Sequence, residues 1–300
     1  MDSCTGSRLR QPFVMVVIHD SLCAEYGSSQ RPEQPARVIQ SVRHLRAIHP
    51  EWEWRTPSIA SDALLRLAHS PAHLRRLVQP HDFDADTPFF PGIYDHARRA
   101  VGGAAEAAQL AYASGGPAFA LMRPPGHHAT ASQAMGFCYL NSLAIAALHA
   151  QVNLGAARVA VWDFDAHHGN GTEAILRGRD NFLFTSVHQS PGYPGTGAYS
   201  LDNCHNWPVR PQVPPELHRA ALRESLDAVV AFRPDLILVS AGFDAYKGDP
   251  ITDMALDTSD FSILGRWLKE TGIPAAAVLE GGYSADLPLL IDAFLTAWDK

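Results

Sequence analysis

The feature that most constrains the fold is the segment 159–170, which reads Val-Ala-Val-Trp-Asp-Phe-Asp-Ala-His-His-Gly-Asn. An apolar, valine-containing run that ends in ionisable residues and glycine is typical of a buried parallel strand with a site at its carboxyl end. Because side chains alternate along a strand, we predict that Asp163, Asp165 and His167 lie on one face. Burying two carboxylates and an imidazole is costly unless they are paired or bound to a cation. The pattern therefore favours a metal site over a solvated polar loop.

Strand and helix patterns alternate along the rest of the chain. Strands are predicted over residues 13–18, 119–122, 159–165, 181–188, 235–240 and 275–279. Helices are predicted over 35–46, 95–113, 140–151, 216–232, 260–271 and from 285, with two short helices in 61–78 separated at Pro71 and loops over 81–92 and 190–215. This alternation predicts one α/β domain over residues 13–300, with a mostly parallel sheet covered by helices on both faces. The polar residues 1–12 are predicted to be disordered.

Composition argues against several classes of function. The net charge of −7 leaves no surplus of cations to neutralise phosphates, so we expect no direct binding to nucleic acid. No apolar stretch approaches the ~18 residues needed to cross a bilayer, and the short run 13–18 is interpreted as a strand rather than a signal peptide. The four cysteines, Cys4, Cys23, Cys138 and Cys204, form no C-x-x-C pair, which excludes a cysteine-type structural zinc motif. Nothing indicates a disulfide framework, so a reducing cytoplasm is expected.

Reactive or flexible residues follow each predicted strand. They form the segments 19–20, 123–128, 165–168, 188–190, 241–244 and 280–283. In open α/β sheets, ligands bind outside the carboxyl ends of the strands. Turn chemistry alone is a poor explanation for so many such segments, so we predict one active site at this edge of the sheet.

Six motifs occur in a fixed order within residues 13–295. They are Arg-Pro-Pro-Gly-His-His-Ala at 123–129, Gly-Phe-Cys-Tyr-Leu-Asn at 136–141, Asp-Phe-Asp-Ala-His-His-Gly-Asn-Gly at 163–171, Pro-Gly-Thr-Gly at 194–197, Ser-Ala-Gly-Phe-Asp at 240–244 and Glu-Gly-Gly-Tyr at 280–283. This set resembles the histone deacetylases and their bacterial relatives. Asn170 and the last motif resemble the class II branch, which includes deacetylase-like amidohydrolases and acetylpolyamine amidohydrolases. The resemblance implies the α/β arginase/deacetylase fold, with about eight strands in a central sheet.

The resemblance implies that Asp165, His167 and Asp244 are ligands of one divalent metal per chain, usually zinc. Three protein ligands leave coordination open for a water and a substrate carbonyl, which is the pattern of catalytic zinc. Two carboxylates also suit iron(II) or another divalent ion. The resemblance is also compatible with a second, structural cation, a monovalent ion such as K⁺.

The resemblance also implies the catalytic groups. His127 is expected to bond Asp163, and His128 is expected to bond Asn170. A carboxylate partner raises the pKa of a histidine, whereas an amide partner adds no charge. His128 is therefore assigned as the general base and subsequent acid, and His127 as a charged helper. The hydroxyl of Tyr283 is expected to donate a hydrogen bond to the oxyanion. The two glycines before it permit φ values that other residues resist.

Five further residues are implied to bind substrate. Gly136, Phe137 and Tyr193 correspond to a narrow aromatic channel. Asp86 corresponds to a rim aspartate that accepts hydrogen bonds from a peptide backbone. Ile251 falls at the rim position where polyamine-selective relatives can carry glutamate, and an apolar residue there suits the methylene stem of an acyl-lysine.

These residues predict a zinc-dependent amide hydrolase that removes acetyl or other short acyl groups from lysine side chains. An acetylpolyamine amidohydrolase, with the same chemistry on a small acetylated amine, is the nearest alternative. An arginase-like binuclear manganese hydrolase would need additional aspartate ligands where this chain has His127 and Asn170. A binding module without catalysis is disfavoured by the complete catalytic set. The sequence leaves a homo-oligomer open.

Overall fold

The structure, a computed structural model, describes residues 14–300 and contains one eight-stranded sheet with the strand order β2-β1-β3-β8-β7-β4-β5-β6. The strands are β1 (Val16–Ile18), β2 (Glu53–Arg55), β3 (Ala118–Ala120), β4 (Val159–Asp163), β5 (Phe182–Gln189), β6 (Cys204–Val209), β7 (Leu236–Ala241) and β8 (Ala275–Leu279). Each pair of neighbouring strands runs parallel. The predicted α/β fold and parallel sheet are confirmed. The prediction for residues 1–12, and the start of the first strand at Phe13, lie outside the described residues.

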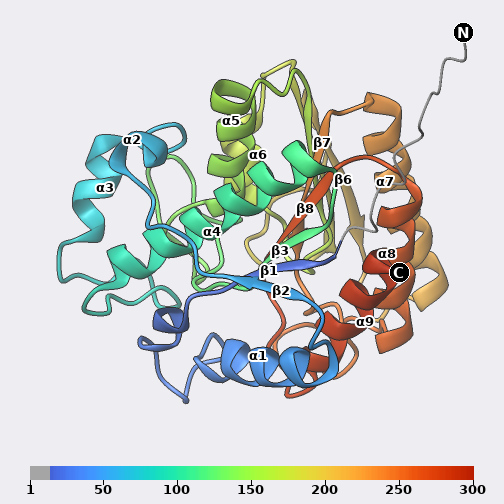
Figure 1. The fold of residues 1–300 in the computed structure, drawn as a ribbon, viewed down its shortest axis with the longest axis horizontal. Coiled ribbons are helices and arrows are strands. Elements are labelled where there is room, and N and C mark those ends of the chain that lie inside the picture. Colours follow the sequence, from blue (N-terminus) through green and yellow to red (C-terminus); the bar gives the residue numbers. More distant parts are fainter. Residues whose placement is uncertain (1–13) are drawn as a thin grey trace, which may run out of the picture.

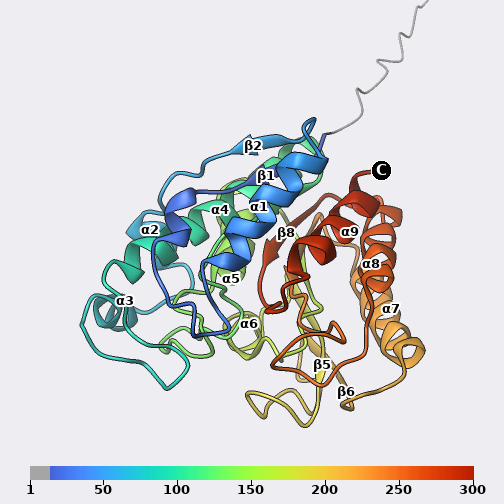
Figure 2. The same cartoon turned by 90° about the horizontal axis from the view of Figure 1, so that it is seen from below.

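Helices cover both faces of the sheet (Figures 1 and 2). One face carries α4 (Ile93–Ser114), α5 (Ser142–Leu154) and α6 (Asn170–Leu176), and the other carries α1 (Ala36–Ile48), α7 (Pro215–Phe232), α8 (Thr258–Glu270) and α9 (Leu287–Asp299). Two short helices, α2 (Asp62–Leu65) and α3 (Pro71–Leu77), and the 3-10 turn Ser21–Ala24 lie in the connecting segments. Within residues 14–300, no helix is both long and apolar enough to cross a membrane.

An aromatic layer joins the central strands to the second helical face. Trp162 of β4 and Phe164 just beyond it meet edge to face at 5.2 Å between ring centroids, and Phe164 meets Phe294 of α9 at 5.4 Å. The indole N–H of Trp162 donates to the Ser225 hydroxyl of α7 over 3.0 Å. Buried edge-to-face aromatic pairs stabilise a fold beyond the burial of their apolar area. This layer therefore holds the carboxyl end of β4 against α7 and α9.

Two sequence predictions need correction, and two elements were missed. The segment 190–215 is not all loop, because residues 204–209 form the edge strand β6, whose polar residues and Pro208 hide the strand pattern. The short edge strand β2 and helix α6 were also not predicted. Finally, β4 ends at Asp163, so strand alternation does not place Asp165 and His167; the turn after the strand does.

The strand order brings the site together. Strands β3, β8, β7 and β4 are consecutive neighbours in the sheet, although they come from distant parts of the chain. Because the four strands are parallel, the loops that follow them leave at the same edge. The motifs at 123–128, 280–283, 241–244 and 163–170 therefore meet there.

Candidate active site

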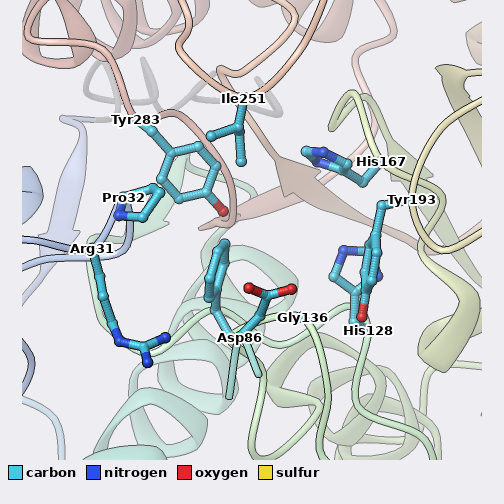
Figure 3. A pocket seen from close by; sticks show the side chains of 10 residues that line it. Arg31, Pro32, Asp86, His128, Gly136, His167, Tyr193, Ile251 and Tyr283 are labelled. Carbon is cyan, nitrogen blue, oxygen red and sulfur yellow. The ribbon is translucent and has the colours of Figure 1, made fainter. Parts of the chain in front are cut away.

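A pocket of about 260 Å³ opens at this edge of the sheet (Figure 3). The predicted site residues that line it are Asp86, His128, Gly136, Phe137, His167, Tyr193, Ile251 and Tyr283, and Arg31 and Pro32 complete the wall. Of the other predicted residues, Asn170 contacts His128, and Asp165 and Asp244 contact His167. His127 contacts Asp165 and Asp163 and so joins them to the same network. All thirteen predicted residues thus belong to one site.

Three side chains, of which His167 lines the pocket, form a group that could hold a metal ion; we call this group, together with the tandem histidines and Tyr283, the pocket floor. One ligand atom from each of Asp165, His167 and Asp244 lies within 4.8 Å of the others. Nδ1 of His167 is 3.2 Å from Oδ1 of Asp165 and 2.8 Å from Oδ2 of Asp244. Among the described residues, Oδ2 of Asp244 is nevertheless a buried oxygen that accepts no hydrogen bond. A cation between the three ligands would satisfy it, so the group fits a divalent metal.

Backbone amides hold the two carboxylates in place. The N–H groups of His167 and Gly281 donate to the two oxygens of Asp165 over 2.8 and 2.7 Å, and the N–H of Ala166 donates to Oδ1 of Asp244 over 2.8 Å. Burial raises the pKa of Asp244, and the nearby Asp165 raises it further. A bound cation would oppose both effects, because it favours the charged carboxylates.

Glycines let the chain approach this group closely. A Cβ at position 281 would collide with carboxylate oxygens of both Asp165 and Asp244. Gly282 has φ +112°, a conformation that other residues rarely adopt. The two glycines before Tyr283 therefore serve different needs, close packing for the first and backbone conformation for the second.

The tandem histidines have different partners. Nδ1 of His127 is 3.1 Å from Oδ2 of Asp163, and Nδ1 of His128 is 2.8 Å from Oδ1 of Asn170. Both contacts are as predicted. Although burial lowers the pKa of His127, the carboxylates of Asp165 and Asp163 raise it to about 10. Burial lowers the pKa of His128 well below its usual value, and the charge of His127 lowers it further. These shifts favour a charged His127 and a neutral His128.

The amide partner also fixes the tautomer of His128. Oδ1 of Asn170 can only accept a hydrogen bond, so Nδ1 of the neutral His128 carries the proton and donates it. Nε2 of the same ring is left without a proton and can accept one. The arrangement is that of a general base facing a pocket.

Aromatic side chains form the walls. The rings of His128 and Tyr193 meet edge to face at 5.0 Å, and those of Phe137 and Tyr283 at 5.7 Å. The Tyr283 hydroxyl points into the pocket from the side opposite His128 and Tyr193 (Figure 3). A Cβ at Gly136 would come within 2.6 Å of the His128 ring and 2.8 Å of the Tyr193 ring. Glycine at this position keeps the passage between the walls open.

Comparison with known proteins agrees with this geometry. Residues 31–296 match the histone deacetylase domain. The chain belongs to the histone deacetylase family. A probable deacetylase of Methanothermobacter thermautotrophicus is 36% identical over 287 residues, which cover 91% of this chain and 86% of that protein.

Two solved structures share the fold. The HD domain of HDA15 superposes with a TM-score of 0.88 at 29% identity, over 94% of this chain and 90% of that one. An acetylpolyamine aminohydrolase from Burkholderia pseudomallei gives 0.84 at 26% identity, over 95% and 98% of the two chains. Membership of this family makes the protein a hydrolase that acts on amides rather than a binding module.

Several residues that support the site of this family member were not singled out in the sequence. Oε2 of Glu280 accepts from the backbone N–H groups of Gly126 and His127 over 2.6 and 3.1 Å. Asp249 accepts from the N–H groups of Tyr283 and Ile251 over 2.7 and 3.0 Å. Glu280 lies inside the Glu-Gly-Gly-Tyr motif, and its position at the end of a buried strand is a usable signal. Asp249 lies in an irregular segment, where no pattern marks it.

Arg37 also supports Tyr283 from outside the predicted set. Its Nε donates to the carbonyl of Gly282 over 2.7 Å, and it donates to the carbonyl of Glu280 as well. Its guanidinium carbon lies 4.7 Å from the centre of the Tyr283 ring. In the sequence Arg37 is one more polar residue of a predicted helix, so only the packing of α1 against the loop after β8 reveals this contact.

Proposed function

We propose that residues 13–300 act as one catalytic domain, a zinc-dependent hydrolase that removes acetyl or other short acyl groups from lysine side chains. The observation that carries the proposal is the composition of the pocket floor. The Asp165, His167 and Asp244 group lies beside a neutral His128, and the Tyr283 hydroxyl faces the same space from the opposite wall. These are the parts that hydrolysis of an unactivated amide requires.

Asp165, His167 and Asp244 would hold the metal. The donor set of two carboxylates and one imidazole suits zinc, with iron(II) as a chemically reasonable substitute. When bound there, zinc lowers the pKa of a coordinated water toward neutrality and polarises an amide carbonyl. The chain itself supplies the remaining functions.

His128 moves the protons. Its free Nε2 accepts a proton from the attacking water, and the same nitrogen then donates that proton to the leaving lysine amine. His127 contacts Asp163, whose carboxylate favours the charged imidazolium. Its positive charge favours the negative charge that develops on the substrate oxygen, and it restrains His128 from holding a second proton.

Tyr283 stabilises the oxyanion. Burial raises the pKa of its hydroxyl well above the usual value, so the group stays protonated and can donate. Asp249 and Arg37 hold the peptide unit that joins Gly282 to Tyr283, Asp249 at its N–H and Arg37 at its carbonyl. A donor held in place before the reaction needs little reorganisation when charge develops.

The channel suits a linear, uncharged stem. Phe137 and Tyr193 would flank the methylene groups of the substrate, and Ile251 presents an apolar side chain at the rim. A polyamine would instead place a distal ammonium near that rim, where Ile251 offers no charge. The exposed carboxylate of Asp86 lines the same pocket and favours the second candidate, acetylpolyamine hydrolysis.

The two candidates separate in one assay. Zinc-loaded protein is given an acetyl-lysine peptide and N-acetylputrescine under the same conditions, and kcat/KM is measured for each. We expect the peptide to be the better substrate. A protein at least tenfold better on N-acetylputrescine would favour the polyamine candidate, and a protein inactive on both would contradict the proposed function.

A further inference from the structure

Arg31 is a cation at the pocket mouth that the proposed chemistry does not use. It lies in the segment between β1 and α1, is partly exposed, and lines the pocket together with Asp86 and Ile251. Its Nη1 donates to the carbonyl of Ala85 over 3.1 Å. No carboxylate among residues 14–300 forms an ion pair with it, so most of its N–H groups are available to a ligand.

The neighbouring arginines are different. Arg37 and Arg123 both pair with the buried Glu33 and also donate to backbone carbonyls, so their guanidinium groups already have partners within the fold. Arg31 has one carbonyl partner, on the loop that carries Asp86. That bond holds the guanidinium beside the pocket without neutralising its charge. An unpaired guanidinium held at a pocket mouth is suited to bind a carboxylate.

A cationic, an anionic and an apolar side chain therefore line the mouth of one pocket. Arg31 offers donors and positive charge, Asp86 offers an acceptor, and Ile251 offers an apolar contact (Figure 3). The main chain of a lysine residue with a free carboxylate matches this set, because its carboxylate can face the arginine and its N–H the aspartate. The side-chain stem of the same residue would descend past the isoleucine toward the floor.

We propose that Arg31 binds the α-carboxylate of the substrate and selects acyl-lysines that carry one, as the C-terminal residue of a peptide or as the free amino acid. The assignment rests on the proposed deacylase function. A peptide with an internal acyl-lysine presents only a neutral carbonyl to Arg31, and a hydrogen bond to it is weaker than one between two charged groups. A polyamine presents an ammonium, which the guanidinium repels.

The test compares substrates that differ in one group. A short peptide ending in acetyl-lysine is prepared with a free carboxylate and with a C-terminal amide, and N-acetylputrescine is the third substrate. For the zinc-loaded wild type we expect kcat/KM to be about tenfold higher for the carboxylate than for the amide, as for one partly exposed ion pair. Arg31→Gln should reduce this ratio to about one and leave the amide substrate within about twofold of wild type.

Two further variants and a control sharpen the result. Arg31→Lys should retain part of the ratio, because the charge remains but the bidentate geometry is lost. Arg31→Glu should reduce the rate on the carboxylate peptide further and raise kcat/KM for N-acetylputrescine. Arg66→Gln removes an exposed arginine that does not line the pocket and should change nothing. Thermal unfolding and zinc content, measured for every variant, establish that folding is retained.

The outcomes separate this proposal from the one on which it rests. A wild-type ratio near one, or a ratio that Arg31→Gln leaves unchanged, would overturn the role of Arg31 while deacylation of lysine stands. Hydrolysis of N-acetylputrescine alone would contradict the lysine substrate and with it the role of Arg31. The amidated peptide is the substrate that distinguishes the two failures, because it reports deacylation without an α-carboxylate.

Discussion

The floor of the pocket and its mouth are built in different ways. At the floor, the side chains of the metal group have several partners; Asp165, for example, contacts two backbone N–H groups and His167. At the mouth, Ile251 and Tyr193 are 36% and 37% exposed, and the Arg31 side chain donates a single hydrogen bond to residues 14–300. The floor is therefore determined by many contacts at once, and the mouth by few.

This difference separates chemistry from substrate choice. A change at the floor disturbs a buried, charged network, where losing one partner leaves another group unsatisfied. A change at the mouth alters one exposed contact and leaves the network intact. We therefore expect floor variants to lose turnover on every substrate, and mouth variants to alter the ratio between substrates.

Removing the metal should have the largest effect. Since Asp165, His167 and Asp244 form the one cluster of metal-ligating groups found among the described residues, we expect one divalent ion per chain. Chelation should abolish activity on all substrates, and one equivalent of zinc should restore it. Metal analysis before and after chelation measures the stoichiometry. Two ions per chain, with full activity on manganese alone, would instead support a binuclear mechanism of the arginase kind.

Tyr283→Phe should have the next largest effect. Loss of one oxyanion donor typically lowers turnover by about 10²–10³, or roughly 3–4 kcal/mol. KM and zinc content should stay near wild type, because the ring remains against Phe137 and Arg37. Tyr199→Phe is the matched control, since Tyr199 is 81% exposed and does not line the pocket. If Tyr283→Phe keeps more than about a third of wild-type turnover while chemistry limits the rate, the proposed role is wrong.

The sequence allowed better prediction of buried than of exposed parts of the fold. Strands β4, β7 and β8 are central and fully buried, so they are apolar except at Asp163 and Ser240, and the strands are recognisable. The edge strands β2 and β6 bury fewer side chains, and β6 contains Pro208. Their sequences therefore resemble loops. Parallel pairing with one neighbour, which no local pattern encodes, makes them strands.

The same reasoning applies to the site. His127, His128 and the three residues of the metal group lie in motifs at strand ends, so the sequence could indicate them. Arg31 and Asp249 lie in irregular segments, and their importance follows only from which loops pack together. Local sequence carries no information about that packing.

Asn170→Asp should change the pH dependence of the floor. Burial and the charge of His127 hold the pKa of His128 well below its usual value of 6.5, so His128 stays an active base at pH values below 6.5. A carboxylate at position 170 would favour the imidazolium and raise that pKa. The acidic limb of kcat/KM should therefore move to higher pH. Asn153→Asp, on the exposed end of α5, is the control, and an unmoved limb would show that His128 is not the base.

Ile251→Glu should have the smallest effect, on substrate choice rather than on turnover. The side chain lines the pocket at its exposed rim, and its backbone N–H is anchored by Asp249, so the substitution changes the charge at a fixed position. A glutamate there can pair with the distal ammonium of a polyamine, which isoleucine cannot do. Because the pair is partly exposed to solvent, its free energy is small.

We therefore expect Ile251→Glu to shift the ratio of kcat/KM toward N-acetylspermidine, relative to an acetyl-lysine peptide, by on the order of tenfold. The sum of kcat/KM for the two substrates should change less than their ratio, because the substitution leaves His128 and Tyr283 in place. Val152→Glu adds the same charge at a position that is 61% exposed and does not line the pocket, and it should leave the ratio unchanged. Asp86 could already supply a negative charge at the rim. Adding Asp86→Asn to the Ile251→Glu variant measures how much Asp86 contributes to the ratio. If Ile251→Glu lowered both rates equally, the mouth would be coupled to the floor, and the proposed separation of substrate choice from chemistry would fail.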